Sequence, residues 1–81
     1  MVRLKLQKRK TKKYIKFLED VIESCFINQR TKIGFIYEKK QVEIIGKIIA
    51  IDPINHAIVI ERNDSITILP IKNIIYIENI H

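Results

Sequence analysis

The feature that most constrains the fold is a pair of β-rich segments that meet at one polar corner within residues 42–61. The first segment is apolar on both faces, and Gly46 stands where a long strand would have to bend sharply. A strand bent in this way can serve two sheets. At the corner, Pro53 presets φ, while Asp52 and Asn55 can bond nearby backbone groups. The pattern predicts a β-hairpin against which the other segments pack.

The composition also favours strands. The chain holds 20 isoleucines against 4 leucines and 4 valines, and a β-branched side chain is stiff and packs well on a pleated surface. We therefore expect residues 33–80 to be mostly β. The 81 residues make one small domain, of a size that buries only about 60% of its unfolded surface and is marginal when alone. We therefore expect self-association or a partner to stabilise the fold.

The net charge of +6 is concentrated at the N-terminus. Residues 1–13 carry no acidic side chain, whereas residues 14–81 hold 8 basic and 9 acidic side chains. Such a basic arm suits a polyanion such as nucleic acid or an anionic surface, although a basic end can also serve only to keep a chain soluble. The basic residues of the arm are Arg3, Lys5, Lys8, Arg9, Lys10, Lys12 and Lys13.

The single cysteine and the lack of long apolar runs bear on the compartment. Cys25 cannot form a disulfide within the chain, and the N-terminus shows no basic-then-apolar secretion signal. No run approaches the roughly 18 apolar residues that a membrane helix needs. The expected location is the cytoplasm, without a membrane partner.

A helical period begins after Thr11. Apolar residues recur at spacings of three and four, which predicts an amphipathic helix over about residues 12–28, with Thr11 as its N-cap. Residues 1–10 alternate in part and could add an edge strand, but residues 1–13 are interpreted as a flexible arm and residues 14–81 as the folded domain. The expected core stripe is Tyr14, Leu18, Val21, Ile22 and Cys25, with Lys16, Glu19, Asp20 and Glu23 facing away.

Five strands are predicted, at about residues 32–37, 42–51, 56–62, 66–69 and 74–77. A helix followed by five short antiparallel strands, one of them strongly bent, predicts a mostly β fold in which a five-stranded antiparallel sheet forms a small, partly open barrel. The last two strands contain no lysine or acid, and an exposed apolar edge of this kind is a template for another chain. When one edge of each subunit pairs with the other edge of the next, the subunits form a closed ring if the rotation between neighbours adds up to a full turn. A ring-shaped homo-oligomer is therefore expected.

These residues resemble the Sm-like (LSm) fold, and specifically its Hfq-like RNA chaperone branch. The resemblance covers about residues 14–80. It depends on the order of helix and strands, on Gly46 within the second strand, on Ile51 and Asp52 closing that strand, and on the sequence Asn-Ile-Ile-Tyr-Ile at residues 73–77, which is similar to the end of the second Sm motif.

The resemblance implies both an assembly and a function. Subunits of this family form rings of six or seven, in which the fourth strand of one subunit pairs with the fifth strand of the next. The rings bind single-stranded RNA, here expected to be uridine-rich or adenine-rich. The implied role is in post-transcriptional regulation, RNA pairing or RNA turnover.

The resemblance also assigns RNA-binding positions. Pore-side pockets come from the two tight loops, which here are residues 52–56 and 71–73. Tyr37 falls where Hfq has a tyrosine that stacks on adenines at the opposite, distal face, with barrel packing as an equal alternative. The pore-side positions are Asp52, Asn55, His56, Lys72 and Asn73, and the basic rim after the helix is reduced to Arg30 and Lys32.

Considered without the family, the same two loops offer RNA-binding chemistry. Amides and imidazole can read a base edge, and lysine can meet a phosphate. Asp52 and Asn55 could instead only cap a β-turn, and His56 could be an ordinary strand residue. The sequence also departs from the family, because the Hfq signature Tyr-Lys-His-Ala is replaced by Pro-Ile-Lys-Asn at residues 70–73, so that Lys72 stands in the histidine place.

Catalytic and metal-binding patterns are missing from the sequence. With only Gly34 and Gly46, the chain has neither a GxGxxG motif nor a P-loop, and one cysteine with His56 and His81 does not make a closed zinc site. No enzyme activity, cofactor or metal is expected. The main alternative is a small β-barrel interaction module of a larger complex, with nucleic-acid contact only through the basic arm. A DNA-binding barrel would share the arm but prefer duplex.

Overall fold

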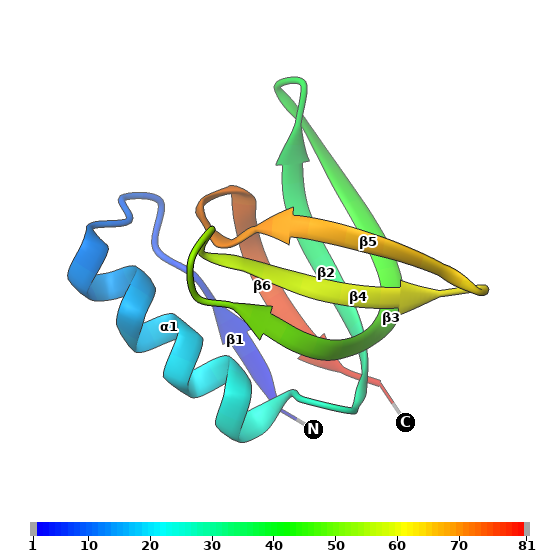
Figure 1. Ribbon diagram of the computed structural model, residues 1–81. Coiled ribbons are helices and arrows are strands. Elements are labelled where there is room, and N and C mark those ends of the chain that lie inside the picture. The colour runs from blue at the N-terminus through cyan, green and yellow to red at the C-terminus, as the bar shows by residue number, and fades with distance from the viewer. Residues whose placement is uncertain (1, 81) are drawn as a thin grey trace.

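The computed structural model describes residues 2–80, which form one α-helix and one six-stranded antiparallel sheet that does not close (Figure 1). The mostly β fold with an N-terminal helix is confirmed, but the predicted number of five strands is too small by one. The strand order is β1-β6-β2-β3-β4-β5, so β1 and β5 form the two edges. In chain order the elements are β1 (Arg3–Lys5), α1 (Lys12–Cys25), β2 (Arg30–Tyr37), β3 (Lys40–Asp52), β4 (Ala57–Arg62), β5 (Ser65–Pro70), the 3-10 helix η1 (Ile71–Asn73) and β6 (Ile74–Asn79).

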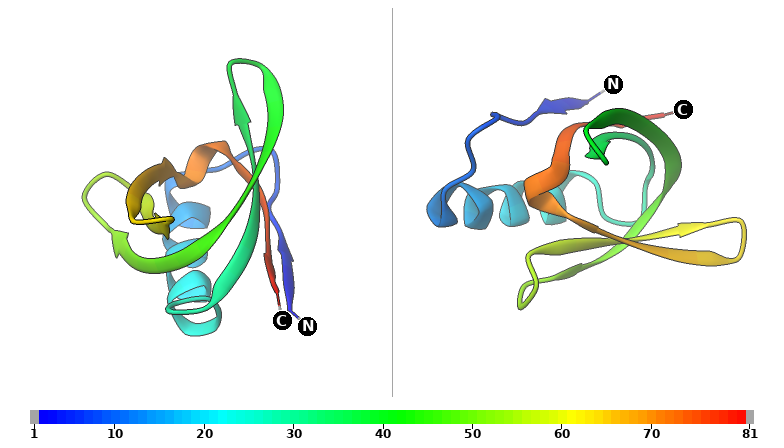
Figure 2. Two further views of the ribbon diagram at one scale, coloured as in Figure 1. Left: turned by 90° about the vertical axis from the view of Figure 1, so that its right-hand side faces the viewer. Right: turned by 90° about the horizontal axis from the view of Figure 1, so that it is seen from above.

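Strand β3 holds the two halves of the sheet together. Its residues 40–47 pair with β2, whereas residues 47–52 pair with β4. The ladder with β4 shifts between Ile48 and Ala50, and such a bulge adds to the bend of a strand. Figure 2 shows β3 curving from one partner to the other. The bent strand expected from residues 42–51 is present, but it joins two parts of one sheet and does not serve two separate sheets.

Gly46 lies where β3 passes close to β4. A Cβ atom at this position would lie 2.5 Å from Ile60 Cγ2, 2.7 Å from Arg62 Cγ and 3.0 Å from the Glu61 carbonyl oxygen. On the β2 side, the buried Thr31 hydroxyl donates to the Gly46 carbonyl oxygen over 3.1 Å. Gly46 does not have a positive φ. What this position requires is the lack of a side chain.

The N-terminal arm, interpreted from the sequence as flexible, contains a strand. Residues 3–5 form β1 and pair antiparallel with β6. Apolar packing holds this strand in place. Leu6 is only 4% exposed and belongs to the core, and Leu4 packs against that core. The partial alternation of residues 1–10 therefore produces an edge strand, and the prediction of a flexible arm is wrong for this part.

Helix α1 begins at the predicted residue and ends earlier than predicted. The Tyr14 N–H donates to the Thr11 hydroxyl over 3.1 Å, so Thr11 is the N-cap. The helix ends at Cys25 with Phe26 as its C-cap, and Asn28 has a φ of 62°, which turns the chain out of the helical path. Leu18 and Ile22, from the predicted stripe, are fully buried.

The core lies between α1 and the inner face of the bent sheet (Figures 1 and 2). Every strand from β2 to β6 contributes to it, and isoleucine supplies most of its volume. The largest fully buried side chains are Phe26, Leu18, Ile22, Ile33, Ile48, Ile58, Ile60, Ile71, Ile74, Ile77 and Thr31.

Replacement of Gly46 by alanine should destabilise the fold by about 1–3 kcal/mol, because the added Cβ would overlap Ile60 and the backbone of Glu61. The measurement is the free energy of unfolding from urea denaturation. Lys47→Ala is the matched control, since Lys47 is exposed on the same strand. Equal effects of the two substitutions would contradict the tight contact at Gly46.

Candidate nucleic-acid interface

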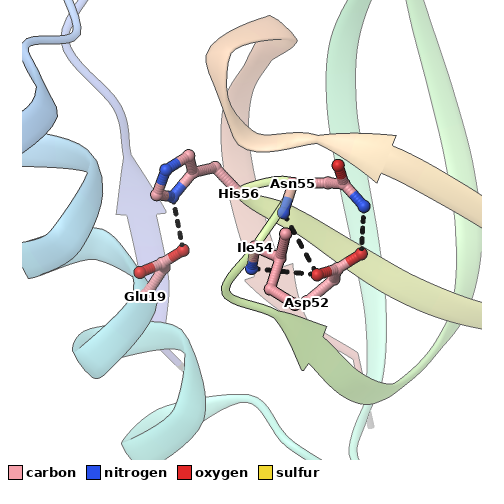
Figure 3. A network of polar contacts seen from close by, with 5 residues as sticks. All are labelled: Glu19, Asp52, Ile54, Asn55 and His56. Carbon is pink, nitrogen blue, oxygen red and sulfur yellow. Dashed lines mark hydrogen bonds and ion pairs between the residues drawn. The ribbon is translucent and has the colours of Figure 1, made fainter.

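The corner between β3 and β4 is held by Asp52. Its Oδ1 accepts hydrogen bonds from the backbone N–H groups of Ile54 and Asn55, at 3.0 and 3.1 Å. Its Oδ2 accepts from Asn55 Nδ2 at 2.8 Å (Figure 3). Two of the residues assigned to the pore-side pocket therefore bond each other and close the turn.

The same bonds set the electrostatics of the corner. The hydrogen bond from the Asn55 side chain, followed by that from the Asn55 backbone, lowers the pKa of Asp52 below its ordinary value. The carboxyl group is therefore an anion at neutral pH, and an anion repels phosphate. Contact between this corner and an RNA backbone would depend on neighbouring cations.

His56 joins the corner to the helix. Its Nδ1 lies 3.0 Å from Oε2 of Glu19 in α1 (Figure 3). The His56 side chain is 50% exposed, whereas that of Glu19 is 7% exposed. A carboxylate beside Nδ1 favours a proton on that nitrogen, which leaves Nε2 of the neutral ring as an acceptor. The imidazole is thus oriented with Nε2 directed away from Glu19.

Glu19 is a residue that the helical period misplaces. The period puts it on the outward face with Lys16 and Asp20, but Glu19 is buried. Glu19 is buried by a tertiary contact, because the β3–β4 corner brings His56 against this part of α1. The two partners are 37 residues apart in the sequence, so no local pattern could have identified the pair.

The second tight loop, η1, adjoins the corner. The Ile71 N–H donates to the His56 carbonyl oxygen over 2.9 Å. Lys72 is exposed and Asn73 is half-buried. Within residues 2–80, the Lys72 ammonium group forms no ion pair. The five positions assigned to a pore-side pocket thus come from two loops in direct backbone contact.

Tyr37 lies apart from these loops. It ends β2 and is 60% exposed, so its ring does not pack in the core. The β2–β3 hairpin that carries it projects from the body of the sheet (Figure 1). The next residues, Glu38 and Lys39, both have positive φ, as a tight two-residue hairpin turn requires. The tyrosine ring is open to stacking at a different part of the surface from the corner.

The basic arm leaves the sheet at the end where η1 lies. The Leu6 N–H donates to the carbonyl oxygen of Ile75, two residues beyond η1. Lys12 and Lys13 form the start of α1, whose first turn has no acidic residue, so their charge adds to the positive end of the helix dipole. Burial lowers the pKa of Lys10. The exposed basic residues of the arm are Arg3, Lys5, Lys8, Arg9, Lys12 and Lys13.

Arg30 belongs to an open groove that crosses β2, β3 and β4. It pairs across strands with Lys47, and Arg62 and two glutamates line the same groove. Lys47 and Arg62 are basic residues that the sequence alone does not place here, because the strand register decides it. Lys32, the other predicted rim residue, is half-buried two residues further along β2.

Residues 2–80 show neither a metal cluster nor a membrane-spanning helix. No group of three or more histidine, cysteine, aspartate or glutamate residues in this range could hold a metal ion. Helix α1 is too short and too polar to cross a membrane. Comparison of the chain with protein-family models, curated proteins and solved structures found no match.

Replacement of Asp52 by asparagine should lower stability in a pH-dependent way. Because the folded-state pKa is lowered, the ionised carboxyl stabilises the fold above its unfolded pKa, and this contribution is lost as the pH falls through the folded value. The urea midpoint of the variant should lie below that of the parent at pH 7, and the difference should shrink in acid. Asp64→Asn, at an exposed position in the β4–β5 turn, is the control. A difference independent of pH would contradict this role.

Proposed function

We propose that this chain is an Sm-like subunit of the Hfq type, which binds single-stranded RNA in the cytoplasm and acts in post-transcriptional regulation, RNA pairing or turnover. The element order supports this, because α1 is followed by five antiparallel strands of which β3 is long and bent. Among these five, β5 and β6 lie at opposite ends of the order, as pairing of unlike edges around a ring requires. The active form would be a ring of six or seven copies.

The observation that carries the proposal is the contact between the two loops. The hydrogen bond from Ile71 to His56 sets the β3–β4 corner beside η1, so an imidazole and the Lys72 ammonium group lie on adjoining loops. An imidazole can hydrogen-bond a base edge, and lysine can meet a phosphate. Repetition of this weak site around a ring would raise its affinity by avidity.

The hydrogen bonds of Asp52 reduce the number of side chains in the proposed pocket that are free to bind RNA. Since the side chains of Asp52 and Asn55 bond each other, base reading would fall to His56 and Asn73, and phosphate contact to Lys72. Tyr37 would offer a separate stacking surface, which tolerates any base because every base has a π-face. Adenine-rich and uridine-rich strands could thus meet different parts of the molecule.

A second candidate function is favoured by β1. Because β1 covers the outer edge of β6, the edge of β5 is the one left open for pairing in the described chain. This arrangement suits an interaction module that docks onto a larger complex as a monomer or dimer. RNA would then meet only the basic arm, so the two candidates differ in which lysines matter for binding.

Lys72→Ala should weaken binding to oligouridine or oligoadenine by about tenfold, as the loss of one charged hydrogen bond would give. It should also change the ratio of the two affinities, measured by fluorescence anisotropy. Lys72 is exposed, so the fold should be unaffected. Lys16→Ala, exposed on α1, is the matched control. Equal behaviour of the two variants would favour the interaction module.

Replacing the basic residues of the β1–α1 connection and of the first turn of α1 by glutamine should flatten the salt dependence of RNA binding. Each lost phosphate contact removes about 0.7 from the log–log slope for single strands. The substitutions spare β1, because truncation of the arm would also remove Leu6 from the core. Substitution of Lys16, Lys39 and Lys40 is the control. An unchanged slope would refute the role of the arm. The residues to change are Lys8, Arg9, Lys10, Lys12 and Lys13.

A further inference from the structure

The N-terminal segment runs along most of the outer edge of β6. The ladder of β1 continues on both sides of its three paired residues. The Leu6 N–H donates to the Ile75 carbonyl oxygen over 2.8 Å, and the Asn79 N–H donates to the Val2 carbonyl oxygen over 2.9 Å. Strand β6 is therefore paired on both sides, with β2 and with β1.

Side chains hold β1 from both faces. On the inner face, Leu6 belongs to the core and Leu4 packs against it. On the outer face, the Arg3 guanidinium group lies 4.7 Å from the centre of the Tyr76 ring, and Arg3 Nη1 lies 3.5 Å from Glu78 Oε2. The Arg3 side chain is 58% exposed, and salt screens an ion pair in such a position. The segment is thus anchored by leucine and oriented by a contact that solvent can reach.

The opposite edge of the sheet is uncovered. Strand β5 pairs with β4 alone, and residues 65–70 include no charged side chain. Ile66 and Ile68 are 56% and 62% exposed. A charge-free apolar edge strand is a template for another strand, and natural edges usually carry a lysine, a proline or a cover that prevents this. Here Pro70 stands only at the end of the strand.

Strands β5 and β6 match in length, since each has six residues. Strand β5 of a second copy could therefore pair along the whole of β6, whereas residues 2–6 of the same chain pair with residues 75–79 and leave Ile74 uncovered. The two strands compete for the same backbone groups, so both cannot be paired there at once. The intramolecular strand competes at an effective concentration on the order of millimolar.

We propose that β1 is a removable cap on the edge of β6, and that the partner it excludes is β5 of a second copy of this chain. This inference rests on the proposed ring, because it names what controls ring assembly. The capped chain is a monomer. Release of β1 opens the edge, and copies then join β5 to β6.

A reversible lock tests the cap directly. Arg3 and Glu78 are directly opposed between the hydrogen-bonded positions, where Cα atoms lie about 4.5 Å apart and a disulfide fits. The variant Arg3→Cys/Glu78→Cys, with Cys25→Ser, should be a monomer by native mass spectrometry at every concentration when oxidised. Its reduced form, in which the Arg3 contacts are also gone, should assemble as the concentration rises. Failure of the disulfide to form, or equal assembly of both forms, would overturn the proposal.

A weakened cap tests the opposite direction. Arg3→Glu removes both outer contacts and places an anion beside Glu78, while Leu4 and Leu6 keep the core intact. It should lower the concentration for half assembly by up to roughly tenfold relative to Lys5→Glu, which makes the same change of charge without an ion pair to break. Equal midpoints of the two variants would count against the cap.

A further pair of substitutions identifies the partner edge. In the Arg3→Glu background, Ile68→Lys on β5 should abolish assembly, whereas Ile54→Lys, at an 86% exposed position in the corner, should not. Assembly that survives Ile68→Lys would refute β5 as the incoming strand.

The same proteins separate the cap from the RNA-binding proposal. Lock-dependent assembly supports the cap whether or not the particles bind oligouridine or oligoadenine. Rings that assemble but bind neither oligonucleotide would refute the RNA-binding function alone. If neither the reduced double-cysteine variant nor Arg3→Glu assembles at any concentration, the cap proposal is refuted, whatever the monomer binds.

Discussion

The close approach of β3 to β4 at Gly46 is the constraint on which the rest of the structure depends. Because no side chain intervenes there, β3 can leave β2 and continue along β4 without a break. This continuity decides which strands become edges. Strand β5 ends one side of the sheet, while β6 on the other side still offers a ladder that β1 completes. The position of the two edges follows from how one long strand is bent.

Features encoded within a few residues could be predicted from the sequence. The start of α1 follows from Thr11 and the apolar period after it, and the corner follows from the turn chemistry of Asp52 and Asn55. The isoleucine-rich segments became strands because a β-branched side chain suits a pleated surface in any register. The contact between the two loops that form the candidate site also follows once β4 and β5 are neighbours.

Features that depend on distant partners could not be predicted. The helical period describes only the helix, so it could not show that the corner would cover Glu19 and join it to His56. The alternation around Leu4 and Leu6 is too short to distinguish a strand from a loose arm, and the backbone that orders it lies far away in the sequence, in β6. The basic charge of the arm does not reveal this order, because basic residues with exposed heads flank two leucines that pack inward.

The pairing of Val2 with Asn79 brings the two ends of the described chain together at one point of the sheet. Anything attached to either end, such as an affinity tag, would emerge near the edge where β1 pairs with β6. The same geometry suits circular permutation. Joining the ends by a short linker and opening the chain at the exposed Asn63–Asp64 turn would keep every strand pair. Contact between β1 and β6 would then become local in sequence, and local contacts form faster than distant ones.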